Sequence, residues 1–96
     1  MKREYELSLV IRVDSNEEVM NDVVTEVKGW VEVDESSAVT KIDRWGRRKL
    51  AYEIDRQRDG YYVIMQAEIE PTSIDELERN LKLSNSILRY LLIRPD

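Results

Sequence analysis

Residues 43–54 read DRWGRRKLAYEI and combine two patterns in one short segment. In the second half, every second residue from Leu50 to Ile54 is large and apolar, which is the period of a half-buried strand. The first half contains four cations around Trp45 and Gly46, and charged residues are rarely buried in a protein core. We therefore expect this strand to present a basic, aromatic-centred tip to another molecule.

The charge of this region contrasts with that of the rest of the chain. All 96 residues together carry a formal net charge of −5. From Lys41 to Arg58, seven basic and three acidic residues give +4, which leaves −9 for the remainder. A cationic segment in an otherwise acidic chain predicts a local contact with a polyanion.

Composition excludes several kinds of chemistry. The chain has no cysteine for disulfides or thiolate chemistry, and no histidine, the commonest general base and metal ligand. We accordingly expect no cofactor and no metal site. The absence of an apolar run of about 18 residues predicts a soluble, intracellular chain. Its length predicts a single domain spanning residues 1–96.

Apolar periodicity predicts four strands and two helices. Capping serines are expected to open the helices, Ser15 the first and Ser73 the second. A polar hairpin loop is expected over residues 55–60, because it ends in the turn-forming pair Asp59-Gly60. The predicted strands cover residues 4–13, 38–54, 61–69 and 87–94.

The order β-α-β-β-α-β is the split βαβ arrangement of the ferredoxin-like fold, in the α+β class. Right-handed crossovers place both helices on one face of a four-stranded antiparallel sheet. Trp45, Tyr5, Tyr52 and Tyr61 are expected to join the core. The aliphatic core between sheet and helices is predicted to contain Leu7, Leu9, Val23, Val27, Leu50, Val63, Met65, Leu77 and Leu81.

The second face of this sheet has no helix to cover it. The last strand has an ambiguous parity, but either parity leaves apolar side chains on that face. Burying one such side chain stabilises by roughly 1.5–3 kcal/mol, so an exposed cluster is an unused driving force for association. We expect a protein partner to contact Val10, Tyr62, Ile64, Leu91 and Ile93.

Four segments of the chain match a known family. They are Tyr5-Glu6, WGRRKLAYEI at 45–54, Gly60-Tyr61-Tyr62, and ILRY at 87–90. Through these segments the chain resembles bacterial small-subunit ribosomal protein six, and the resemblance extends over essentially the whole chain. The resemblance implies a non-catalytic, cytoplasmic ribosomal protein with the ferredoxin-like fold. It further implies binding to the central domain of small-subunit ribosomal RNA and pairing with small-subunit ribosomal protein eighteen.

The cations of the basic tip are the leading candidates for RNA contact, because arginine forks suit phosphate. The competing interpretation is an edge strand that uses charge to block aggregation. For Trp45, filling the core is the favoured role and stacking on a base is the alternative. The predicted RNA-binding residues are Lys2, Arg3, Arg44, Trp45, Arg47, Arg48, Lys49, Arg89 and Arg94.

Other functions of the same fold fit less well. An RRM-type reader of single-stranded RNA needs a basic residue before its third-strand glycine, where this chain has Asp59. An acylphosphatase-like enzyme needs a glycine-rich anion cradle at the first helix, but residues 14–18 are acidic and lack glycine. We therefore expect no enzyme. An RRM-like RNA-binding module and a ligand-sensing ferredoxin-fold module stay open as alternatives.

Overall fold

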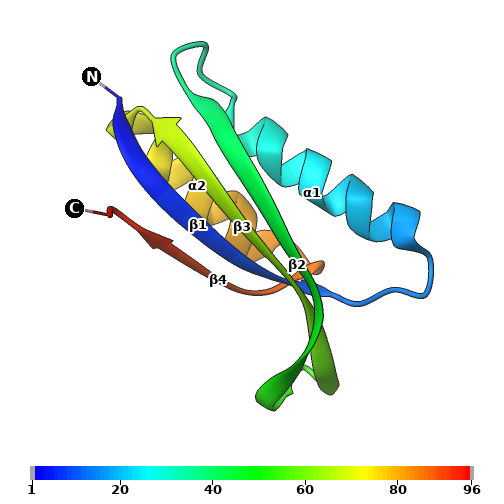
Figure 1. The fold of residues 1–96 in the computed structure, drawn as a ribbon. Helices are drawn as coiled ribbons and strands as arrows, with labels where there is room; N and C mark the ends of the chain where they lie inside the picture. The colour runs from blue at the N-terminus through cyan, green and yellow to red at the C-terminus, as the bar shows by residue number, and fades with distance from the viewer. Residues whose placement is uncertain (1, 96) are drawn as a thin grey trace.

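The computed structural model describes residues 2–95 and forms one antiparallel sheet with two helices against one face (Figure 1). The strand order is β2-β3-β1-β4, so the predicted ferredoxin-like fold is confirmed. Among these residues, no helix is both long enough and apolar enough to cross a membrane. The elements are β1 (Arg3–Arg12), α1 (Glu17–Val31), β2 (Ala38–Ile54), β3 (Gln57–Ile69), a 3-10 turn (Pro71–Ser73), α2 (Ile74–Leu83) and β4 (Ile87–Ile93).

The core lies between the sheet and the helices. Helix α1 is rich in valine, which has a low helix propensity, so its burial against the sheet stabilises it. Its N-terminus is capped by Asn16, whose side chain accepts a 2.9 Å hydrogen bond from the Glu18 backbone, and not by Ser15 as expected. The buried cluster contains Leu7, Leu9, Ile11, Val23, Val24, Val27, Val31, Val63, Met65, Ala67, Ile69, Leu77 and Leu81.

The register of β4 settles which of its residues face the helices. The strand pairs with β1 through an irregularity, because Val10 faces Arg89 while Ile11 faces Ile87. Past this point, Tyr90 and Leu92 pack against the core. The alternate residues, Arg89, Leu91 and Ile93, therefore lie on the uncovered face of the sheet, which we call the open face.

The prediction of a hairpin loop over residues 55–60 is wrong. Strands β2 and β3 are joined by a two-residue turn in which Asp55 and Arg56 both have positive φ, as in a type I′ turn. Gly60 lies inside β3, where a Cβ atom would come within 2.3 Å of Val10 Cγ1. The glycine therefore permits close packing and does not make a turn.

The β2–β3 hairpin continues beyond the end of β1, whose last pair joins Arg12 to Gly60 (Figure 1). Tyr52 in this extension lies on the open face, so it is 60% exposed and not in the core. Leu50 is buried as expected, but on the open face beside Val10. Tyr5 and Tyr61 do pack against the core.

Trp45 is not a core residue either, because 54% of its surface is exposed. It lies at a register shift in the pairing of β2 with β3, between Arg44 and Gly46. Gly46 has φ of +83°, a conformation that glycine adopts without steric cost. Arg44, just before it, lies opposite the helix-facing Val63, so the alternation of β2 directs Trp45 to the other side of the sheet.

Candidate functional site

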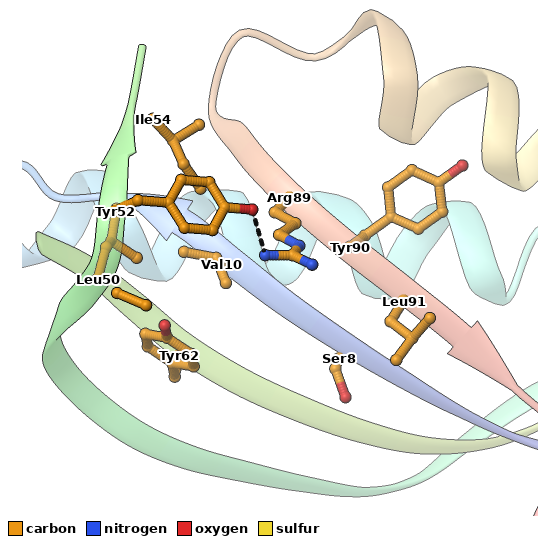
Figure 2. Close-up of a pocket in the computed structure, with 10 residues that line it drawn as sticks. Ser8, Val10, Leu50, Tyr52, Ile54, Tyr62, Arg89, Tyr90 and Leu91 are labelled. Atoms are coloured by element: carbon orange, nitrogen blue, oxygen red, sulfur yellow. Dashed lines mark hydrogen bonds between the residues drawn. The ribbon is translucent and has the colours of Figure 1, made fainter. Parts of the chain in front are cut away.

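The β2–β3 hairpin curves toward β1 and β4, and together they form a groove of about 270 Å³ on the open face (Figure 2). Tyr52 on β2 points across it toward β4, and Leu91 forms part of the opposite wall. Its lining is mainly apolar, from Val10, Leu50, Tyr52, Ile54, Tyr62 and Leu91. Such a shape suits an apolar side chain of a partner.

A contact across the groove joins its two walls. Arg89 of β4 donates a 2.8 Å hydrogen bond to the Tyr52 hydroxyl, and its guanidinium carbon lies 5.9 Å from the centre of that ring. Both side chains are exposed. Arg89, predicted to bind RNA, therefore lines the groove, and its hydrogen bond to Tyr52 connects β4 to the hairpin.

The turn of the hairpin is tied to the end of β1. Arg12 forms an ion pair with Asp55, and it also donates a 3.1 Å hydrogen bond to the Asn85 carbonyl. The hydrogen bond from Arg12, reinforced by its charge, lowers the pKa of Asp55 below its usual value. The charged carboxylate is thus part of what keeps the hairpin curled toward the sheet.

All five predicted partner residues face the open side of the sheet. Leu91 and Ile93 are the most accessible, at 58% and 41% exposed, whereas Val10 is buried beneath the groove. Tyr62 lines the groove and Ile64 lies next to it along β3. Sequence reasoning missed three lining residues, Leu50, Tyr52 and Ile54, because their visible alternation pointed equally well to the helix-facing side.

The other end of the open face is acidic. Glu4 of β1 lies directly opposite Glu68 of β3, and like charges in that position destabilise a strand pair. Lys2 offsets part of this charge with a 3.4 Å ion pair to Glu68. Glu6, one pair further on, accepts a 3.0 Å hydrogen bond from Gln66. The open face therefore combines an apolar groove with an acidic end.

We call the cations Arg44, Arg47, Arg48 and Lys49 of β2 the basic ridge. All four are exposed. Arg44 donates a hydrogen bond to Asn21 of α1, while Arg47 pairs with Asp59 at 2.9 Å. Within residues 2–95, Arg47 is the one ridge cation that has a carboxylate partner. Most of the ridge charge is therefore available to an anion.

The remaining predicted cations are separated from the ridge. Arg3 begins β1, Lys2 precedes it, and Arg94 directly follows β4. Figure 1 shows these two strand ends at the opposite end of the sheet from the hairpin turn. Two cations that were not among the predicted site residues, Arg56 and Arg58, are exposed at the hairpin end. Their contribution to the +4 charge of residues 41–58 was the signal that could have identified them. No cluster of potential metal ligands occurs in the described part of the chain.

Comparison with known proteins gives a consistent result. The family model of ribosomal protein S6 matches residues 4–94. Small ribosomal subunit protein bS6 of Carboxydothermus hydrogenoformans is 38% identical over 96 residues, covering 100% of this chain and 99% of the relative. The same protein of Alkaliphilus metalliredigens is 40% identical over 90 residues and covers 94% of each chain.

A solved structure agrees with the sequence relatives. Ribosomal protein S6 of Thermotoga maritima superposes with a TM-score of 0.90 at 28% identity, covering 99% of this chain and 89% of that one. Because the match covers 99% of this chain, it includes the sheet and both helices. The chain thus belongs to the ribosomal protein S6 family and is a protein of the small ribosomal subunit, located in the cytoplasm.

Proposed function

We propose that this chain is a non-catalytic structural protein that binds the central domain of small-subunit ribosomal RNA together with small-subunit ribosomal protein eighteen. The observation that carries the proposal is the double role of β2. One half of this strand forms the exposed basic ridge, and the other half forms a wall of the apolar groove. The two surfaces are adjacent, so one strand can join an RNA and a protein.

The ridge supports the RNA contact. Four exposed cations occur within six residues, from Arg44 to Lys49, on a strand at the sheet edge. Arginine and lysine that neutralise phosphates release counterions, which drives binding and makes it dependent on salt. The −9 charge of the remaining chain opposes this encounter, so RNA binding by the chain alone is expected to be weak.

The open face supports a basic protein partner. The groove offers apolar surface that no helix covers, and burial of that surface favours association. At the other end, the opposed pair Glu4 and Glu68 would be stabilised by a cation from outside. A basic protein seated there would also offset the acidic background that repels RNA.

Salt dependence tests the RNA contact. Four neutralised phosphates predict a slope of about −3 for log K against log salt. The double variant Arg47→Ala/Lys49→Ala should reduce the slope to about half, because it removes two of the four contacts. The matched control is Arg79→Ala/Lys82→Ala, which removes the same charge from exposed positions of α2. An equal slope in the two double variants would contradict the assignment of phosphate contacts to the ridge.

A further inference from the structure

Trp45 is the aromatic side chain that neither the core nor the groove uses. Tryptophan is among the residues that proteins bury most extensively, yet here 54% of its surface is exposed. It lies in the β2 bulge beside Gly46 and lines no part of the groove. A large exposed aromatic ring next to a glycine bulge is open to a flat ligand.

The ring is held in place from one side. The guanidinium carbon of Arg48 lies over the indole, 5.8 Å from its centre. Arg48 also donates a 3.4 Å hydrogen bond to the Trp45 carbonyl oxygen, which ties the cation to the same bulge. A ring supported in this way loses less freedom when a second flat group stacks on it.

The surroundings of the ring select the ligand class. Residues 44–49 contain four cations and no acid, and the one carboxylate paired with them in the described part of the chain is Asp59, through Arg47. Exposed aromatics set among cations are the chemistry of sites for single-stranded nucleic acid, where bases stack and phosphates meet the charges. A protein contact at this ring would have to be acidic, whereas the partner inferred for the open face is basic.

We propose that Trp45 is a stacking platform for an unpaired RNA base, with the phosphates next to that base contacting cations of the basic ridge. This inference rests on the proposed RNA binding and goes beyond it, because it selects RNA with an unstacked nucleotide over a continuous duplex. Bases inside a paired stem are already stacked and cannot reach the ring.

Fluorescence isolates this side chain. The chain has two tryptophans, and the other, Trp30, packs against the core from α1. In a Trp30→Phe background, the emission of Trp45 reports base stacking directly. The probes are an RNA stem with an internal single-stranded bulge and the same stem fully paired, each titrated at low salt, where phosphate contacts bind most strongly. We expect quenching by the bulged RNA and little quenching by the paired RNA.

Variants then measure the contribution of the ring. Trp45→Ala should lower affinity for the bulged RNA about 10-fold or more while leaving the salt slope unchanged, since stacking neutralises no phosphate. Trp45→Phe should retain most of the affinity. The control is Leu83→Ala, which removes an exposed apolar side chain, 70% exposed, from α2 and should change neither RNA affinity.

Each outcome decides between the two proposals. Equal affinity for both RNAs without quenching, and an unchanged affinity in Trp45→Ala, would overturn the stacking site but leave the phosphate contacts intact. Binding of neither RNA would overturn the proposed function itself, and the stacking site with it. A loss confined to binding of a protein partner in Trp45→Ala would overturn the stacking site and reassign the ring to a protein interface.

Discussion

Arg89 donates a hydrogen bond to the hydroxyl of Tyr52, a residue 37 positions away in the chain, and so connects β4 to the curled hairpin. The guanidinium also lies over the tyrosine ring, at 5.9 Å from its centre. Together with the ion pair between Arg12 and Asp55, this contact sets the width of the groove. The groove is therefore produced by the hairpin position and not by the sheet alone.

Acid should release the hairpin. The hydrogen bond and charge of Arg12 lower the pKa of Asp55. The ion pair between the two residues therefore stabilises the hairpin fully at pH values above the ordinary aspartate pKa of about 3.9. This effect is lost as pH falls through the lower folded-state pKa, because the carboxyl group then becomes neutral. Amide exchange in residues 50–59 should accelerate in this acidic range. Asp55→Asn should abolish this acid-dependent increase in amide exchange, whereas Asp34→Asn, remote from the hairpin, should leave it in place. An increase that persists in Asp55→Asn would show that Asp55 does not hold the hairpin.

Gly60→Ala should destabilise the fold by about 1–3 kcal/mol, as overpacking does. The new Cβ atom would lie 2.3 Å from Val10 Cγ1 and 3.2 Å from Leu50 Cδ2, and both side chains are buried. Urea unfolding measures the change. Gly29→Ala is the matched control: a Cβ atom added there, in α1, would meet no neighbouring group within 4 Å, so a gain of up to about 1 kcal/mol is expected.

Adding Val10→Ala to the Gly60 variant should recover part of the loss, because it removes the atom that the new methyl group meets. If Gly60→Ala proved as stable as Gly29→Ala, the close approach of β1 to the hairpin would be wrong.

Leu91→Asp should weaken binding of a partner protein at least 10-fold, or about 1.4 kcal/mol, because it places a charge in an apolar interface. Leu91 is 58% exposed, so the fold should remain intact. Val33→Asp is the control, since Val33 is 64% exposed in the segment after α1 and lies outside the groove. Calorimetric titration of both variants with ribosomal protein eighteen makes the comparison, and equal affinities would place the interface elsewhere.

The fold was predictable because the apolar periods of β1, β3 and both helices agree with one topology. The hairpin was not, because the pair Asp59-Gly60 has the composition of a turn while Gly60 actually serves packing against Val10. A turn of Asp55 and Arg56, neither of them glycine, gives a much weaker sequence signal.

The site was predictable in part. Strand alternation placed Leu91 and Ile93 on the open face once the register of β4 was known. The exposure of Trp45 was not predictable, because a large aromatic side chain is as typical of a core as of a binding surface. Distances across the fold are also absent from the linear sequence, which is why Lys2 and Arg94 were grouped with ridge residues that lie at a different part of the sheet.

We propose that the basic ridge and the open face act together, and that a basic partner makes RNA binding effective. The direct test is titration of a central-domain RNA fragment with this chain alone and with this chain plus ribosomal protein eighteen, after subtracting binding by that partner alone. We expect weak RNA binding by the chain alone and a strong increase in affinity for the pair, because the partner offsets the acidic background. Equal affinity with and without the partner would contradict it.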